Sequence, residues 1–230
     1  MQIPDSVLKY VEPTALRHSL IRDKVSIVRV IARPNTQYNL SEQFRLRCVF
    51  FHLPKTGGLA VSDALFGNRA SGHISVEDAK LAFGAWRFRW FFKFCFVRNP
   101  WDRLVSAYHY LRKGHPKSPI VPLLQAGSFA EFVANHLNTP VVAREEHIRP
   151  QHSYVTDSAG RLVVDFVGRF ERLAHDYDVV ARRLGVNRPL TTTNRSDHDD
   201  YRRYYDAATQ ARVAEFYRKD IELFDYRFDC

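Results

Sequence analysis

Three stretches of this sequence share one pattern, in which a run of apolar residues is followed by a polar turn and then by a helical pattern. The apolar runs cover residues 46–53, 92–97 and 163–168, and the helices predicted after them cover residues 58–66, 100–113 and 171–184. Apolar runs without alternation are typical of parallel strands that helices cover on both faces. The sequence therefore predicts an α/β sandwich around a central, mostly parallel sheet.

Helix-capping residues support this prediction. Asn99 is placed to cap the second of these helices, with Pro100 at its first position. Comparable signals stand before three further predicted helices: Ser75 with Asp78 before residues 76–83, Ser128 with Glu131 before Phe132, and Asp206 before a C-terminal helix ending near Lys219. A hairpin is predicted over residues 154–164, because turn-forming residues separate two β-rich flanks there.

The length and net charge of the chain indicate how many domains it forms and what kind of partner it binds. The chain has 230 residues, of which 45% are hydrophobic, and this is enough for one domain with a buried core. Residues 1–44 give the weakest signals and form a poorly defined N-terminal extension, with a strand predicted at residues 25–32. The 34 basic and 25 acidic residues give a net charge of +9. Such a charge favours an anionic partner, although a solvated basic surface explains it equally well.

Cysteine usage and hydropathy indicate the compartment. Cys48, Cys95 and Cys230 are too few, and odd in number, for a closed disulfide framework, which favours free thiols in a reducing compartment. The first residues include early acids and no long apolar core, unlike a secretory signal. The most apolar stretch, residues 90–97, is too short to span a bilayer. We therefore expect a soluble, cytoplasmic protein.

The first candidate site is the turn Pro54-Lys55-Thr56-Gly57-Gly58 between a predicted strand and a predicted helix. Glycines let backbone amides approach an anion closely, and the helix N-terminus adds a favourable dipole. Lys55 supplies a positive charge and Thr56 a hydroxyl group. A simple tight turn is the alternative. A Walker A loop is excluded, because it places its lysine after the last glycine.

The second candidate site lies at the end of the next predicted strand. Arg98 has a planar guanidinium that suits a phosphate, and Ser106, two turns into the following helix, offers a further hydrogen bond. The alternative interpretation pairs Arg98 with Asp102 and turns Ser106 toward the core. Because ligands bind at the carboxyl ends of strands in open α/β sheets, the two sites together suit one ligand with phosphates at two places.

These residues resemble the sulfotransferases that depend on 3′-phosphoadenosine 5′-phosphosulfate (PAPS), specifically the carbohydrate branch found in Golgi enzymes and bacterial relatives. Residues 54–58 are similar to that family's 5′-phosphosulfate loop, and residues 96–108 are similar to its 3′-phosphate motif. Shorter similarities run through residues 147–151, 167–171 and 220–226, so that the resemblance covers roughly residues 45–228. It implies a single sulfotransferase domain with a P-loop-like three-layer sandwich, and a bacterial origin.

The resemblance also implies roles for particular residues. Lys55 would bridge donor and acceptor and stabilise the departing phosphate oxygen, while Arg98 and Ser106 would bind the 3′-phosphate of PAPS or of its product PAP. The remaining residues implied in donor binding are Pro54, Thr56, Gly57, Gly58, Leu59, Ala60 and, in a loop that closes over the nucleotide, Arg195. Family members often carry Thr or Ser directly after Gly-Gly, where this chain has Leu59 and Ala60.

Residues 71–75 resemble the segment that carries the base in heparan sulfate uronyl sulfotransferases, which makes His73 the candidate base. His147 beside Glu145 is a rival base or an acceptor contact, and His52 fits a hydrogen-bonded core residue better. Glu145, His147, Arg149 and Gln151 are candidate acceptor contacts, with solvated helix ends as the alternative. For the three tyrosines Tyr201, Tyr204 and Tyr205, we expect packing in the protein rather than stacking on a sugar.

The expected reaction is in-line transfer of a sulfuryl group from PAPS to a hydroxyl of a carbohydrate, without a metal ion and without a nucleic-acid partner. The positive net charge favours an anionic glycan as this carbohydrate. Positioning and electrostatics would supply the catalysis. Two other functions stay open. One is a non-catalytic basic module that binds nucleotide, nucleic acid or anionic glycan, and the other is a nucleotide kinase, which the position of Lys55 disfavours.

Overall fold

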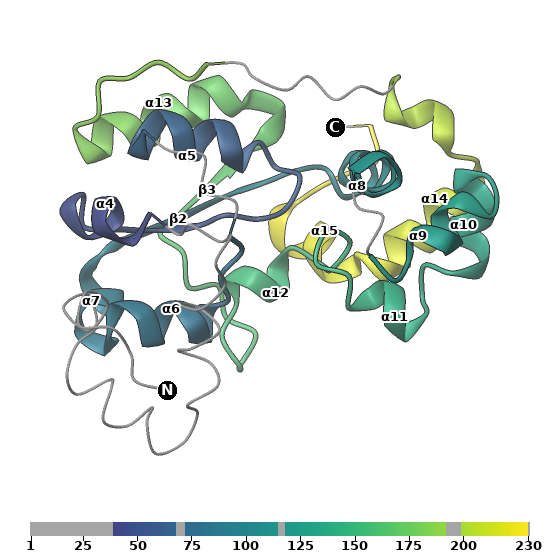
Figure 1. The fold of residues 1–230 in the computed structure, drawn as a ribbon, viewed down its shortest axis with the longest axis horizontal. Coiled ribbons are helices and arrows are strands. Elements are labelled where there is room, and N and C mark those ends of the chain that lie inside the picture. The colour runs from purple at the N-terminus through teal and green to yellow at the C-terminus, as the bar shows by residue number, and fades with distance from the viewer. Residues whose placement is uncertain (1–38, 68–71, 115–117, 192–198, 230) are drawn as a thin grey trace.

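The computed structural model describes residues 39–67, 72–114, 118–191 and 199–229, and Figure 1 draws it as a ribbon. Its centre is a sheet of three parallel strands in the order β1 (Cys48–Phe51), β2 (Phe92–Val97) and β3 (Phe166–Arg169). The predicted parallel sheet is confirmed, with β1 and β3 shorter than the apolar runs that predicted them. The strand expected at residues 25–32 lies outside the described residues.

Side chains that alternate along the strands define two apolar layers. Phe50 and Phe94 pack with α5 (Gly58–Phe66) and α13 (Leu173–Leu184) on one face of the sheet. Phe51 and Val97 pack with α6 (Val76–Phe83) and α7 (Ala85–Trp90) on the other face. Figure 1 shows these helix pairs above and below the strands. The three-layer α/β sandwich is therefore confirmed.

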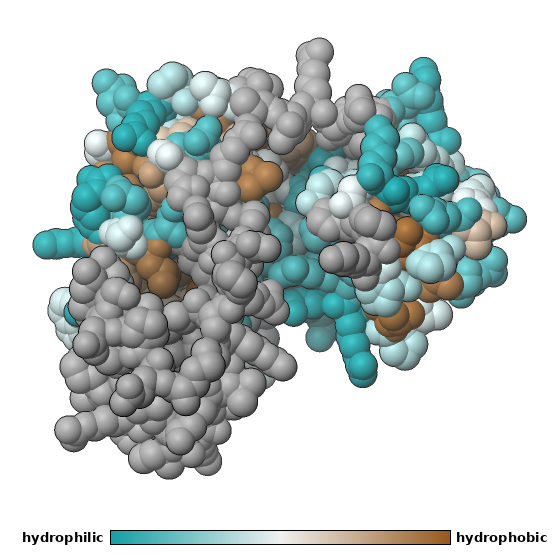
Figure 2. Space-filling model, viewed as in Figure 1, coloured by the Kyte–Doolittle hydropathy of each residue, from teal (hydrophilic) through white to brown (hydrophobic). Residues whose placement is uncertain are grey.

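A second, helical part lies beside the sheet at the right of Figure 1. It begins with α8 (Pro100–Gly114), whose apolar side forms a cluster around Leu104, Tyr108, Phe132 and Tyr217. Its other helices are α9 (Val121–Gln125), α10 (Phe129–Asn135), α11 (Pro140–Ala143), η2 (Tyr201–Tyr204), α14 (Ala207–Phe216) and α15 (Arg218–Phe224). Hydrophilic residues dominate the visible surface of this part in Figure 2, as expected for helices that bury only one face.

Three shorter elements complete the fold: α4 (Leu40–Arg45), α12 (His152–Val155) and η1 (Phe170–Arg172). The C-terminal helix expected to run to residue 219 ends at Phe216, and α15 begins after a break at Tyr217. Tyr217 is fully buried and donates its hydroxyl to the carbonyl of Ile148 at 2.6 Å, so packing explains the break. The predicted hairpin reduces to one bridge, Thr156 to Leu162, because the residues before it form α12.

The predicted caps are present. The Asn99 side chain accepts a hydrogen bond from the Trp101 amide at 3.0 Å, and Ser128 and Glu131 form a reciprocal capping box. The side chains of Ser75 and Asp206 cap α6 and α14 in the predicted way. These caps fix where helices begin, including α8, which carries the second candidate site.

The described cysteines and tyrosines lie as the sequence predicts. Cys48 and Cys95 are buried free thiols, and burial raises the pKa of Cys48 to about 12. Tyr201 donates its hydroxyl to the carbonyl of Phe228, and Tyr205 donates to Trp101, which agrees with a packing role. Among the residues described, every helix is too short or too polar to cross a bilayer.

Candidate active site

The loop after β1 presents a run of backbone amides. Lys55 and Gly57 both have left-handed conformations, with φ of 65° and 78°, and Thr56 donates its hydroxyl to the carbonyl of Leu53 at 2.9 Å. Within the described residues, the amides of Thr56, Gly57, Gly58 and Leu59 have no hydrogen bond of standard geometry. Such a run of open amides at a helix N-terminus fits an anion.

Packing also requires the two glycines of this loop. A Cβ atom on Gly57 would lie 2.7 Å from the Leu173 Cδ2 atom, and one on Gly58 would lie 1.9 Å from the His52 ring. The loop therefore rests directly on α13 and on the end of β1. Tight packing and a close backbone approach to an anion are both served by the same residues.

Lys55 is half-buried, and its ammonium lies 3.8 Å from the centre of the Tyr110 ring. Burial, and then the charge of Arg98, lower the pKa of Lys55 to about 8. Tyr110 comes from α8, and its ring centroid is 5.0 Å from that of His147. The lysine thus contacts a ring of α8, the helix of the second candidate motif, and that ring in turn packs near His147, the rival base.

Arg98 is buried at the end of β2 and already has protein partners. Its Nε and Nη2 donate to the two carboxylate oxygens of Asp102 at 2.7 and 2.8 Å, which is the pairing of the alternative interpretation. Its Nη1 donates to the carbonyl of Lys55 at 3.3 Å, and its guanidinium stacks 4.1 Å from the centre of the Phe170 ring. The two predicted loops therefore meet at one edge of the sheet.

Ser106 lies on α8, two turns after Arg98, and is 5% exposed. No side-chain hydrogen bond is found for its hydroxyl within the described part of the chain. The hydroxyl oxygen is not among the fully buried polar atoms that lack a partner, so it is open to a hydrogen bond from outside the protein, which suits a ligand.

Three histidines gather near the end of β1. His73 donates Nδ1–H to the carbonyl of His52 at 2.7 Å, which leaves its Nε2 lone pair available. Burial, and then the neighbouring His52, hold the pKa of His73 well below its usual range, so the ring is neutral near pH 7. The rings of His52 and His147 have centroids 4.6 and 6.0 Å from that of His73.

The candidate acceptor contacts divide into two groups. His147 donates Nδ1–H to Glu145 at 3.1 Å, Ser118 donates to the other oxygen of Glu145 at 2.7 Å, and the bond from His147 lowers the pKa of Glu145. The guanidinium of Arg149 lies 4.0 Å from the centre of the Tyr154 ring, and its buried Nε has no hydrogen-bond partner among the described residues. These groups stay candidates for contact with a substrate.

Gln151 has a different place from the one expected. It is fully buried, its Oε1 accepts from the Arg98 amide at 2.9 Å, and its Nε2 donates to the Arg98 carbonyl at 2.9 Å. Both ends of its amide are therefore used to hold the backbone of Arg98. This arrangement favours a structural role for Gln151 at the end of β2 over the predicted contact with an acceptor.

Arg103 is an important residue that sequence reasoning missed. It is fully buried on α8, its Nε donates to the carbonyl of Pro54 at 3.0 Å, and its Nη2 donates to the carbonyls of Arg149 at 2.8 Å and His147 at 3.3 Å. One side chain thus joins the Lys55 loop to the segment with the candidate acceptor contacts. The sequence offers no signal for this role of Arg103, because an arginine in an amphipathic helix is usually solvated.

Arg195 lies outside the described residues. Among those that are described, no group of three or more His, Cys, Asp or Glu side chains is arranged to hold a metal ion.

Comparison with known proteins gives one family and several relatives. A model described as "Sulfotransferase family" matches residues 75–227, a span that includes Arg98 and Ser106 and begins after Lys55 and His73. An uncharacterized protein of Archaeoglobus fulgidus is 29% identical over 111 residues, which cover 48% of this chain and 82% of that protein. Carbohydrate sulfotransferase 11 of Rattus norvegicus and that of Mus musculus are each 29% identical over 170 residues, covering 61% of this chain.

The chain spans about half the length of these two carbohydrate sulfotransferases, 48% in each case. No solved structure matches it.

Proposed function

Since the chain belongs to the sulfotransferase family, we propose that it transfers the sulfuryl group of PAPS to a hydroxyl of a carbohydrate. The observation that carries this proposal is the contact between Arg98 and the Lys55 carbonyl, because it joins the two anion-binding loops at the carboxyl edge of the sheet. The similarity to carbohydrate sulfotransferase 11 supports the choice of a carbohydrate as acceptor.

The donor would be held at its two ends. The open amides of residues 56–59 and the Lys55 ammonium suit the 5′-phosphosulfate, and the Ser106 hydroxyl suits the 3′-phosphate. Arg98 has all three nitrogen atoms engaged, so a 3′-phosphate would share its guanidinium with Asp102 or displace the Lys55 carbonyl. Asp102 and Phe170 hold this guanidinium flat and in place before any ligand arrives.

The transfer itself follows from the geometry of the neighbouring groups. The acceptor oxygen forms a bond to sulfur as the bond between sulfur and the 5′-phosphate oxygen breaks, and PAP leaves. The Lys55 ammonium stabilises the charge that develops on that phosphate oxygen. The acceptor proton passes to Nε2 of His73, which is unprotonated because Nδ1 carries the proton.

His147 and Arg149 would position the acceptor. Glu145 and Ser118 fix the His147 ring, and Arg149 has a buried nitrogen atom that lacks a partner in the described structure. Arg103 keeps this segment at a constant position relative to the Lys55 loop.

Calorimetry with PAP in the absence of magnesium tests the donor site. We expect PAP to bind, and Arg98→Ala to weaken its affinity by about two orders of magnitude, since truncating one partner of a buried charge pair costs about 2–5 kcal/mol. Arg161→Gln, which removes a surface pair with Asp157 in the loop between α12 and β3, is the control and leaves the affinity unchanged. Preferential binding of magnesium ATP would instead indicate a kinase.

Sulfate transfer to a carbohydrate tests the chemistry. We expect Lys55→Ala to lower kcat by about 10²–10³-fold, as for loss of a group that stabilises a developing oxyanion. His73→Ala should lower kcat by about 10²–10⁴-fold with PAP affinity retained, as for loss of a general base. Full activity in His73→Ala with loss of activity in His147→Ala would give the role of base to His147.

A further inference from the structure

A pocket lies at the opposite edge of the sheet from the candidate active site. Leu46 and Arg47 precede β1, Phe92 and Lys93 begin β2, and Asp165 precedes β3, so the pocket opens at the amino ends of the strands. Six residues of β2 at about 3.3 Å each separate it from Arg98 by about 20 Å. Its volume is about 420 Å³, within the range of about 300–1,000 Å³ for ligand sites.

Unpaired positive charge surrounds this pocket. Among the described residues, none of the guanidinium groups of Arg47, Arg89 and Arg183 lies within ion-pair distance of a carboxylate. Asp165, the one carboxylate among the described lining residues, is already bound by the Lys93 ammonium at 2.9 Å and the Lys93 amide at 2.8 Å. The pocket therefore keeps about three uncompensated charges, which favours an anionic ligand.

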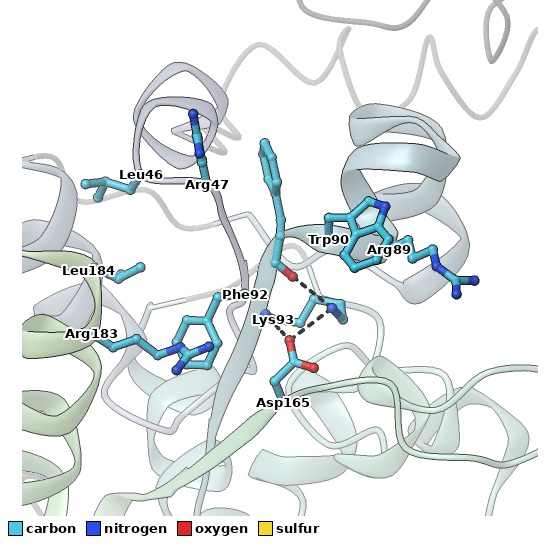
Figure 3. A pocket seen from close by; sticks show the side chains of 10 residues that line it. Leu46, Arg47, Arg89, Trp90, Phe92, Lys93, Asp165, Arg183 and Leu184 are labelled. Atoms are coloured by element: carbon cyan, nitrogen blue, oxygen red, sulfur yellow. Dashed lines mark hydrogen bonds and ion pairs between the residues drawn. The ribbon is translucent and has the colours of Figure 1, made fainter.

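An aromatic surface stands beside these charges. Trp90 is 66% exposed, with the guanidinium of Arg89 5.5 Å from its ring centre, and Arg183 lies 4.4 Å from the centre of the Phe92 ring. Figure 3 shows Trp90 and Arg89 on one side of the hollow and Arg183 on the other, with Lys93 and Asp165 between them. A flat indole among cations suits a ring that has an apolar face and acidic substituents.

We propose that this far-edge pocket binds an acidic glycan, one that bears sulfate esters or uronic acids, at a distance from the site of transfer. The choice of a glycan rests on the proposed function, whereas the choice of an anion rests on the pocket alone. Single-stranded nucleic acid is less suited, because it needs cations and several aromatic platforms along a groove. In the described part of the chain, the cations stand around one hollow beside the exposed indole of Trp90.

Calorimetry with a heparin hexasaccharide in the presence of saturating PAP tests the pocket. We expect Arg89→Gln combined with Arg183→Gln to weaken binding by about tenfold, or about 1.4 kcal/mol, since two exposed ion pairs with the ligand are lost. Trp90→Ala should weaken it severalfold. The matched controls are Arg182→Gln and Trp86→Ala, because both residues are exposed on the same two helices and neither lines the pocket.

Three results would overturn the proposal. The first is an equal loss in the control variants, and the second is equal affinity for neutral maltohexaose. The third is equal binding of a single-stranded hexanucleotide with the same sensitivity to the pocket variants. The proposed function is tested by separate measurements, because PAP affinity and sulfate transfer to a monosaccharide should stay unchanged in every pocket variant. If the native protein does not bind PAP, the proposed function is contradicted, whereas the comparison of glycan affinity between pocket variants and control variants stays valid.

Discussion

Lys55 combines three features that bear on its role. It has a left-handed backbone, which costs a non-glycine residue about 1–2 kcal/mol, and its ammonium lies against an aromatic ring. Its carbonyl accepts a hydrogen bond from Arg98, and the charge of Arg98 helps to lower the pKa of the Lys55 ammonium. Backbone strain of this kind collects at functional sites, where surrounding contacts hold it in place.

The pKa of Lys55, about 8, predicts a proton uptake that depends on pH. At pH 7 the ammonium is already protonated, whereas at pH 8.5 most of it is neutral, and a bound anion raises its pKa again. We therefore expect PAP binding to take up protons at pH 8.5 and few at pH 7, measured by calorimetry in buffers of different ionisation enthalpy. Lys55→Ala should abolish this uptake, and Lys80→Ala, which alters a half-exposed surface lysine, should not. Equal uptake in Lys55→Ala would show that another group titrates.

At the scale of elements, apolar runs followed by capped helices were sufficient to predict β2, α6 and α8 within one residue of their observed ends. Short helices such as α7 and α11 were not predicted, because helices of one or two turns are stable only through tertiary packing. The strand–loop–helix unit around Lys55 was predicted from its glycines, although their contacts with His52 and Leu173 needed the structure.

The close approach of Gly58 to His52 predicts a loss of stability on adding one methyl group. A Cβ atom there would lie 1.9 Å from the His52 ring, so the start of α5 or the ring must move. We expect Gly58→Ala to lower the free energy of unfolding by about 1–3 kcal/mol, the usual cost of overpacking, as measured by urea denaturation. Gly114→Ala is the matched control, because nothing lies within 4 Å of its Cβ position and no loss is expected. Native stability in Gly58→Ala would contradict the described packing.

At the scale of the whole molecule, the convergence of Lys55 and Arg98 was predicted because parallel strands bring their carboxyl ends to one edge. The buried residues that hold this site in place were not predicted. Gln151 and Arg103 are polar residues that the chain buries completely, and their partners lie more than 40 positions away along the sequence. A single sequence carries no signal for contacts of that kind, since burial of a polar group depends on the partner that tertiary structure supplies.

The C-terminal part of the chain supports Arg98 through a buried carboxylate. Asp220 on α15 is fully buried and accepts from the amides of Gln151 at 2.7 Å and His152 at 2.8 Å, and also from Nδ1 of His152 at 2.6 Å. Gln151 in turn holds the backbone of Arg98. The helical part and the end of β2 therefore share one hydrogen-bond network.

This network predicts that Asp220 matters for both stability and donor binding. We expect Asp220→Ala to lower the free energy of unfolding by about 3–5 kcal/mol, because it leaves buried donors without an acceptor, and Asp220→Asn to lower it by about 1–3 kcal/mol. Urea denaturation measures both losses, and Asp229→Asn, an exposed carboxylate of the same segment, serves as the control. In Asp220→Asn we also expect weaker PAP affinity, with a smaller loss than in Arg98→Ala, since the guanidinium is present but less firmly placed. If Asp220→Asn is destabilised and binds PAP as tightly as the native protein, the network supports the fold without positioning Arg98.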